Sequence, residues 1–267
     1  MKTNFHTHTK RCKHGFGTAS DYADAALAAG MDILGFSEHA PFPDHDYGYR
    51  MDYEEFPEYL QEIADLKASL KGKLRIYTGL EIEYMEEYLP YYLSLKENPQ
   101  MDFLALGEHF FHMPSGVLRN IFSAESTHDY VEYAYAIEEA LSTGLFPMLV
   151  HPDVMFINDF AWDKNCDKAC EIILQAAEKH NTILECNANG LRRGIMSFPD
   201  GDRSPYPHPR FWQRLSGSPL RVIVGSDAHA PEQVRDEAVL RAEELCAGWN
   251  LHMIETIFGS SGKEETV

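Results

Sequence analysis

The sequence predicts an α/β protein in which parallel strands form a closed or nearly closed barrel covered by helices. Short apolar runs alternate along the whole chain with segments of helical spacing, a pattern typical of a parallel sheet. Polar residues follow almost every run. The seven runs are 3–8, 32–37, 74–82, 102–107, 147–151, 182–187 and 221–226. The clearest helical segments are 18–29, 53–70, 127–143, 164–180 and 231–246.

The position of the polar residues favours a barrel over an open sheet. His6 and His8 lie in the first run, His39 follows the second, and Glu81 lies in the third. The later runs also end in metal-capable residues: His109 after the fourth, His151 at the fifth, and Asp227 and His229 after the seventh. A barrel collects its site from the carboxyl ends of many strands, whereas an open sheet draws mainly on the strands beside its switch point. Contributions from six of seven strands therefore indicate a ring.

The chain is expected to form one domain. Its 267 residues, 44% of them hydrophobic, suffice for a substantial core. No Pro/Gly/Ser-rich linker or composition break divides it, and no short repeat is present. We expect a single domain over 1–258 and a flexible tail over 259–267.

The charge balance excludes several classes of partner. Asp and Glu outnumber Lys and Arg by 42 to 23, which gives a formal net charge of −19. Such a field repels nucleic acid and offers no basic stripe to a membrane surface. The N-terminus lacks an apolar targeting region, and no run approaches the length of a membrane span. A soluble protein of the cytoplasm that binds neither nucleic acid nor membrane is expected.

The cysteines support a reducing compartment. Five cysteines in a chain of this length are not the pattern of a disulfide scaffold. Cys166 and Cys170 have helical i, i+4 spacing and could bind metal, but no second pair accompanies them. We interpret both as ordinary helix positions.

The histidines instead carry the chemical signal. His6-Thr7-His8 has the i, i+2 spacing that puts two imidazoles on one face of a strand. That spacing alone is weak evidence, but a metal-capable side chain recurs at strand end after strand end. The nine candidate ligands are His6, His8, His14, His39, Glu81, His109, His151, Asp227 and His229.

Imidazole and carboxylate together suit Zn²⁺, Mn²⁺ or Fe²⁺, whereas an oxygen-only set would suggest Mg²⁺ or Ca²⁺. Nine ligands exceed what one ion uses, so two to three divalent ions are expected. Glu81 and Asp227 have the capacity to bridge ions. Glu83 points to the same face of the strand as Glu81, and we prefer Glu81 because it follows Gly79 at the apolar end of the run.

Taken in order, these motifs resemble the polymerase and histidinol phosphatase (PHP) superfamily, and within it the histidinol-phosphate phosphatase branch. The match covers nearly the whole chain. It rests on His6-x-His8 with His14, Glu38-His39-Ala40-Pro41, Thr78-Gly79-Leu80-Glu81, His109-Phe110, His151, Asn187-x-x-Gly190-Leu191-Arg192 and Gly225-Ser226-Asp227-Ala228-His229. The resemblance implies a distorted (β/α)7 TIM-like barrel, in agreement with the seven runs.

The resemblance also implies how the ligands divide among three ions. One ion would be held by His6, His8, Glu81 and Asp227. Glu81 would bridge to a second ion that also takes His109 and His151. A third ion would be held by His14, His39 and His229.

The activity implied is hydrolysis of L-histidinol phosphate to L-histidinol and phosphate, in histidine biosynthesis, by a metal-activated hydroxide. Glu81, Asp227 and His229 are then candidate catalytic residues. A cation outside the metal shell would stabilise the charge on the phosphoryl oxygens. We predict Arg192 for this role ahead of Arg193, with Arg193 and His208 as further substrate contacts.

Two alternatives stay open at the level of sequence. A PHP-type phosphoesterase acting on nucleotides or nucleic-acid ends would share the metal site, although the net charge disfavours it. A non-catalytic metal-binding domain would show complete ligation without an open position. Oligomeric state, native metal and the group that protonates the leaving alkoxide are not specified by the sequence.

Overall fold

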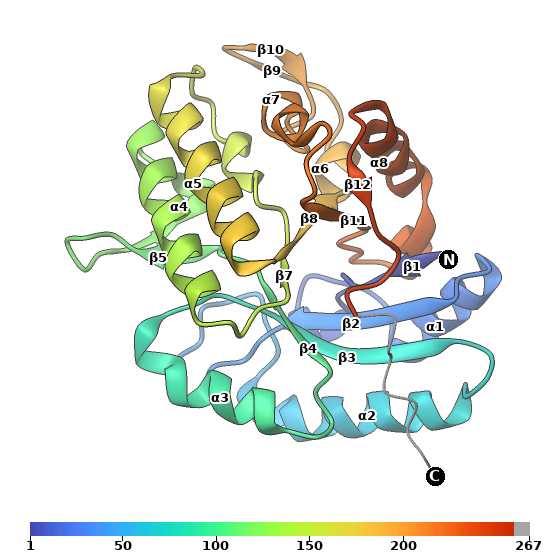
Figure 1. Ribbon diagram of the computed structural model, residues 1–267. Coiled ribbons are helices and arrows are strands. Elements are labelled where there is room, and N and C mark those ends of the chain that lie inside the picture. The colour runs from blue at the N-terminus through green and yellow to red at the C-terminus, as the bar shows by residue number, and fades with distance from the viewer. Residues whose placement is uncertain (259–267) are drawn as a thin grey trace.

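The apolar runs form one curled parallel sheet in the computed structural model, which describes residues 1–258 (Figure 1). The sheet has eight strands in the order β1-β2-β3-β4-β7-β8-β11-β12, and all neighbours are parallel. Their bounds are β1 (Thr3–Asn4), β2 (Ile33–His39), β3 (Arg75–Ile82), β4 (Phe103–Leu106), β7 (Met148–Leu149), β8 (Ile183–Asn187), β11 (Arg221–Gly225) and β12 (His252–Met253). Each predicted run overlaps one of the first seven strands, and β2 extends two residues beyond its run, to His39. The predicted tail, 259–267, lies outside the described residues.

The sheet curls until the segments that follow its first and seventh strands meet. Thr7, after β1, forms an isolated parallel bridge with Ala228, after β11. The His8 amide donates to the Ala228 carbonyl at 2.8 Å, and the Ala228 amide donates to the His6 carbonyl at 3.2 Å. The predicted α/β class and curled parallel sheet are confirmed. β12, which was not predicted, pairs with the start of β11 and is only two residues long, too short for a periodic signal.

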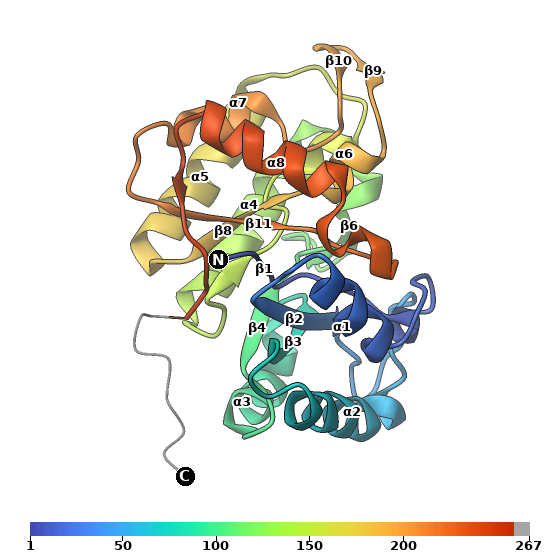
Figure 2. The same ribbon diagram turned by 90° about the vertical axis from the view of Figure 1, so that its right-hand side faces the viewer.

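Helices cover the outer face of the sheet (Figures 1 and 2). The longer ones are α1 (Ala19–Ala28), α2 (Phe56–Ser69), α3 (Leu89–Glu97), α4 (Thr127–Ser142), α5 (Lys164–His180) and α8 (Glu237–Gly248). The short helices are α6 (Asn189–Arg192) and α7 (Pro209–Trp212). The 3-10 turns are η1 (Lys10–Cys12), η2 (Tyr53–Glu55), η3 (Glu86–Tyr88), η4 (Ile121–Ser123), η5 (Val154–Ile157), η6 (Gln213–Leu215) and η7 (Pro231–Arg235). Of the longer helices, only α3 was not predicted. Within residues 1–258, no helix has the length and apolar character needed to cross a membrane.

Two hairpins project from the sheet at the carboxyl ends of its strands. One follows β4 and consists of β5 (Phe110–His112) and β6 (Leu118–Asn120). The other follows α6 and consists of β9 (Met196–Phe198) and β10 (Gly201–Arg203). Both are antiparallel and lie outside the main sheet (Figure 1).

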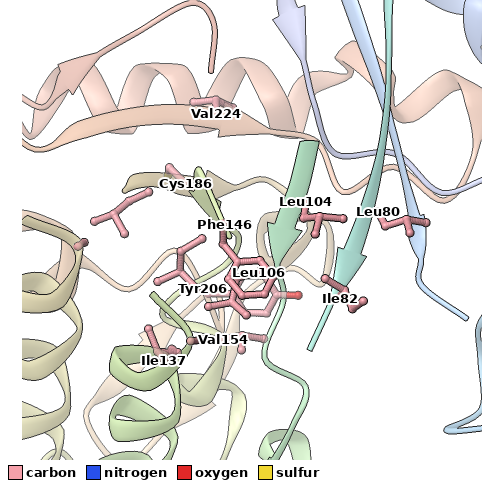
Figure 3. Packing of buried hydrophobic residues seen from close by; sticks show 14 of the residues in the cluster. Leu80, Ile82, Leu104, Leu106, Ile137, Phe146, Val154, Cys186, Tyr206 and Val224 are labelled. Atoms are coloured by element: carbon pink, nitrogen blue, oxygen red, sulfur yellow. The ribbon is translucent and has the colours of Figure 1, made fainter. Parts of the chain in front are cut away.

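Alternation along the strands divides the apolar side chains between two cores. Leu104 and Leu106 of β4 belong to the outer core, where they join Leu80 of β3 and Ile137 of α4 (Figure 3). The intervening Ala105 faces the inside of the curled sheet. Because successive side chains of a strand point to opposite faces, β4 contributes to both cores, and so does β2 through Ile33 and Leu34. The inner core contains Phe5, Ile33, Phe103, Ala105, Met148, Val150, Ile183, Ile223 and Ile257.

Helix α5 illustrates how sequence and packing agree. Asp163 caps its start by accepting from the amides of Asn165 and Cys166, at 2.9 and 3.2 Å. Cys166 and Cys170 are buried on the face turned to the core, together with Ala169 and Ile173. Their interpretation as ordinary helix positions is consistent with this burial, and all five cysteines are free.

We predict that Asp163→Ala lowers the free energy of unfolding by about 1 kcal/mol, the usual effect of removing an N-cap. The Asp163 side chain also accepts from Thr127 Oγ1 at 2.7 Å, which ties α5 to the start of α4. Equilibrium unfolding in urea measures the change, and Asp163→Asn serves as the control because asparagine is an equally good cap. Equal stability of the alanine and asparagine variants would contradict the capping role.

Candidate metal centre

The carboxyl ends of the strands bring the nine predicted ligands to one rim of the sheet. Seven of them line a cavity of about 340 Å³. These seven are His14, His39, Glu81, His109, His151, Asp227 and His229. His6 and His8 are fully buried beside the same cluster, with their ring centroids 4.9 Å apart. The structure therefore brings the nine predicted residues together.

Glu81 occupies the centre of the cluster, and its two carboxylate oxygens face different imidazoles. The Oε1 atom lies 2.7 Å from His151 Nε2 and 3.3 Å from His109 Nε2. The Oε2 atom lies 3.0 Å from His39 Nδ1, 3.2 Å from His8 Nε2 and 3.3 Å from His6 Nε2. A carboxylate with separate groups of donors at each oxygen is placed to bridge two cations.

Asp227 forms a second anionic point beside Glu81. Its Oδ1 atom lies 3.4 Å from His8 Nε2 and 3.7 Å from His6 Nε2. The amides of Asn187 and Asn189 reach its other oxygen, at 3.3 and 3.1 Å. The side chain is thereby oriented from both sides.

Ligand atoms close enough to share one ion form five overlapping triads among the described residues. The triads are His6-His8-Glu81, His6-His151-Asp227, His39-Glu81-His109, His8-His39-His229 and Cys12-His14-His229. The first agrees with the expected first ion. The expected grouping of His14 with His39 and His229 is not one of these triads. His14 instead lies with Cys12 and His229, and His39 lies with His8 and His229.

The electrostatics of the cluster are those of a site built for cations. Burial opposes the charge on Glu81, but the surrounding imidazoles, led by His109, outweigh it and hold the carboxyl pKa well below its usual range. Burial also opposes ionisation of Asp227, but the nearby imidazoles, led by His6, outweigh it and hold the pKa of the Asp227 carboxyl well below its usual range. Both carboxylates are therefore anionic at neutral pH.

Several buried atoms of the cluster have no hydrogen-bond partner within residues 1–258. They are Nε2 of His6, both ring nitrogens of His8, Oε2 of Glu81, Nδ1 of His151 and Nε2 of His229. Buried polar atoms are almost always satisfied in native proteins. Mixed imidazole and carboxylate donors suit Zn²⁺, Mn²⁺ or Fe²⁺, so the residues present fit divalent transition ions.

The backbone carries strain at two of these residues. His151 has φ 33° and Asp227 has φ 48°, both in the left-handed region that non-glycine residues seldom adopt. Such conformations persist where the surrounding structure imposes them, and they gather at functional sites.

Two carboxylates that the sequence analysis did not select hold the imidazoles from behind. Glu185 lies 2.8 and 3.0 Å from His6 Nδ1, and its Oε2 accepts from the His151 amide at 3.2 Å. Glu83 lies 2.9 Å from His109 Nδ1. A partner on Nδ1 leaves Nε2 free to bind metal. The sequence pattern that could have identified Glu185 is a carboxylate inside an otherwise apolar strand, Leu184-Glu185-Cys186.

Glycine is required where these carboxylates approach the backbone. A Cβ at Gly225 would overlap Glu185 Oε1, and a Cβ at Gly107 would overlap Glu81 Oε1. Neither glycine has a positive φ. Both positions are therefore constrained by close approach alone.

Arg192 does not reach the cavity, which corrects the prediction that it clamps phosphate. Its guanidinium donates to both oxygens of Asp236, at 2.7 and 3.1 Å, and to the carbonyls of Ser226 and Gln233. Arg193 is exposed and lines the cavity. Neighbouring residues of a helical turn point about 100° apart, so only one of the two arginines faces the ligands.

His208, predicted as a substrate contact, is not among the residues that line the cavity. It is buried, its Nε2 lies 2.9 Å from Asp200 Oδ2, and its Nδ1 accepts from the Arg210 amide at the start of α7. Burial lowers its pKa to about 4. Its role is to cap α7, and the nearby Tyr206 lines the cavity instead.

The rest of the cavity wall is largely aromatic. Tyr47 and Tyr49 come from the loop after β2, and Phe110, Asn120 and Phe122 come from the β5–β6 hairpin and the turn η4 that follows it. The Phe122 ring stacks on His109 with centroids 5.9 Å apart and is 39% exposed. An open aromatic face therefore borders the imidazole cluster.

Comparison with known proteins agrees with this arrangement. A family model for the PHP domain matches residues 4–189. The chain is 28% identical over 238 residues to a probable histidinol-phosphatase of Deinococcus radiodurans, with 86% of each chain covered. It is 25% identical over 258 residues to a histidinol-phosphatase of Bacillus subtilis, covering 86% of this chain and 94% of the relative.

The fold is shared with a histidinol phosphate phosphatase of Lactococcus lactis, whose crystal structure contains zinc, L-histidinol and phosphate. The TM-score is 0.73 at 20% identity, and 96% of each chain is covered.

Gly225→Ala should weaken metal binding by about 10- to 100-fold, the usual effect of disturbing an outer partner of a ligating histidine. The added methyl group would displace Glu185 from His6. Competition with a chromophoric chelator measures the affinity. Gly248→Ala is the control, because a Cβ there meets no atom within 4 Å. A folded Gly225→Ala protein with unchanged metal affinity would show that Glu185 does not support the centre.

Proposed function

Because the chain belongs to the PHP domain family, we propose that it is a metal-dependent phosphatase that hydrolyses L-histidinol phosphate to L-histidinol and phosphate. The observation that carries the proposal is the Glu81 centre, in which five imidazoles surround one buried carboxylate at the floor of an open cavity. Relatives called histidinol-phosphatase match most of the chain's length. The Lactococcus lactis protein was crystallised with zinc and both reaction products.

The proposal extends to the architecture. We take residues 1–258 as one catalytic domain and the sheet from β1 to β11 as the distorted (β/α)7 barrel of the family, with β12 as an addition. The bridge between Thr7 and Ala228 supports this view.

The nine ligands are proposed to hold two to three divalent ions. His6, His8, Glu81 and Asp227 would hold one ion, and Glu81, His109 and His151 would hold another. The two separate donor groups at the Glu81 oxygens support the bridge. His14, His39 and His229 remain proposed ligands of a third ion, with Cys12 next to His14 and His229. Bound ions supply charge neutralisation for the phosphoryl oxygens and a nucleophilic water at neutral pH.

The chain's own residues orient the substrate around the ions. Arg193 takes over the role first given to Arg192, because it lines the cavity and forms no ion pair with any residue of 1–258. It would bind the phosphoryl oxygens and stabilise their charge in the transition state. Asp227 and His229 line the same cavity and are the candidates for protonating the leaving alkoxide. Asp227 is anionic and His229 is neutral at neutral pH, so either would first accept a proton from the attacking water and then pass it to the alkoxide.

The organic end of the substrate is proposed to lie against the aromatic wall formed by Tyr47, Phe110 and Phe122. An imidazole ring stacks favourably on such side chains. A net charge of −19 also favours a substrate with a cationic ammonium group over polyanionic nucleic acid. Steady-state phosphate release from L-histidinol phosphate, an aryl phosphate and a dinucleotide tests the assignment. A preference for the dinucleotide, or activity that survives chelation, would exclude it.

Elemental analysis should find two to three transition ions per remetallated chain, and Glu81→Gln should lose more activity than His14→Ala. Glu81 contacts both donor groups, whereas His14 lies at the edge of the cluster. The kcat of each variant is measured at saturating metal. Equal losses in the two variants, or less than one ion per chain, would argue against a bridged centre.

Arg193→Ala should lower kcat/KM for L-histidinol phosphate by about 100-fold, the size expected for one preorganised donor to a transition state. Its metal content should not change. Arg192→Ala should instead lower the melting temperature, since it removes the contacts with Asp236. The site assignment fails if Arg193→Ala retains full kcat/KM while Arg192→Ala loses it without a change in stability.

A further inference from the structure

One buried arginine outside the predicted site connects the metal centre to the cavity wall. Arg50 is 4% exposed, lies in the same loop as Tyr47 and Tyr49, and is among the residues that line the cavity. Its guanidinium forms a bidentate pair with Glu83, Nη1 to Oε2 at 3.0 Å and Nη2 to Oε1 at 3.1 Å. A buried charge pair of this geometry is costly to break, because the partner would be left unpaired in the interior.

The same carboxylate also holds a metal-facing imidazole. Glu83 Oε1 lies 2.9 Å from His109 Nδ1, and the opposite nitrogen, Nε2, lies 3.3 Å from Glu81 Oε1. Glu83 therefore accepts the Nδ1 proton and turns the Nε2 lone pair toward the cluster. Arg50 fixes the rotamer of Glu83 from the other side. The positions of Arg50 and His109 are thus linked through one carboxylate.

On its second side, Arg50 holds the loop that forms the cavity wall. Its Nη1 donates to the Ala40 carbonyl at 3.0 Å and its Nε donates to the Gly48 carbonyl at 3.2 Å. The guanidinium carbon lies 5.5 Å from the Phe42 ring centroid and 5.4 Å from that of Tyr47. Tyr47 in turn packs on Phe110 of the hairpin, with centroids 5.8 Å apart. A planar guanidinium can bind a carboxylate at its edge while stacking on rings at its faces, and lysine cannot.

We propose that Arg50 is a positioning residue that acts through Glu83 on the metal ligand His109 and, at the same time, sets the position of the Tyr47 wall against which the substrate's ring binds. The second half of this statement rests on the proposed function. The first half concerns metal binding alone and is independent of the substrate.

The test compares Arg50→Lys, Glu83→Gln and the double variant in the full-length protein. Affinity for Zn²⁺ and for Mn²⁺ is measured by chelator competition, and folding is checked by thermal denaturation of the metal-free protein. Arg50→Lys and Glu83→Gln should each weaken the binding of at least one ion by about 10- to 100-fold. Because Arg50 acts through Glu83, the double variant should lose little more than Glu83→Gln alone. Losses that multiply in the double variant, or unchanged metal affinity in folded Arg50→Lys, would overturn the proposal.

Arg235→Lys provides the matched control. Arg235 also forms a bidentate pair with a glutamate, Glu243, at 2.7 and 3.0 Å, but it contacts no candidate ligand. It should keep wild-type metal affinity. A comparable loss of affinity in Arg235→Lys would show that disturbing any bidentate arginine–glutamate pair has this effect, and would overturn the specific role of Arg50.

A substrate comparison tests the second half. With ions saturating, Arg50→Lys should raise KM for L-histidinol phosphate at least several-fold more than KM for ethanolamine phosphate, which has an ammonium group but no ring. Equal changes for both substrates would overturn the link to the wall. A wild-type protein that hydrolyses neither substrate would refute the proposed function and leave the metal-binding result intact.

Discussion

The structure at the carboxyl end of the sheet depends on a single constraint, a carboxylate that stays ionised in the interior. Glu81 is 1% exposed, and no arginine or lysine pairs with it within residues 1–258. The ionisable side chains within 4 Å of its oxygens, among residues 1–258, are imidazoles, which bring partial positive charge when neutral and full charge when protonated. Divalent cations compensate such a cluster far better. Metal binding and the stability of this end of the sheet are therefore coupled, as in other proteins whose ligands converge only on folding.

This constraint explains why a second layer of carboxylates and close-packed glycines surrounds the ligands. An imidazole can donate its lone pair from only one nitrogen at a time, so its other nitrogen must be held. Glu185 and Glu83 perform that task for His6 and His109. Each outer carboxylate needs space, which Gly225 provides for Glu185. The outer layer extends through Arg50 to the aromatic wall, so the candidate ligands and the wall share supporting contacts.

The two neighbouring arginines after β8 show that one step along the chain can change a side chain from a structural contact to a residue that lines the cavity. Arg192 and Arg193 have the same chemistry and adjacent positions. One is anchored to Asp236 and two carbonyls, and the other is exposed at the cavity. The direction of each side chain follows from the single turn of α6, whose start is defined by backbone bonds to Ala188.

The α/β class, the seven sheet runs and the convergence of nine candidate ligands could be predicted from the amino-acid sequence alone, because the carboxyl ends of parallel strands meet at one rim whatever the details of packing. Period-two alternation, helical spacing and metal-capable residues at strand ends are local patterns, so they can be recognised in the amino-acid sequence. Three outcomes came from the three-dimensional packing: Arg193 and not Arg192 lines the cavity, His208 caps a helix, and Glu83 and Glu185 contact the imidazoles. Those outcomes depend on side-chain direction and on contacts between residues far apart in the chain, such as His6 with Glu185, which no local pattern encodes.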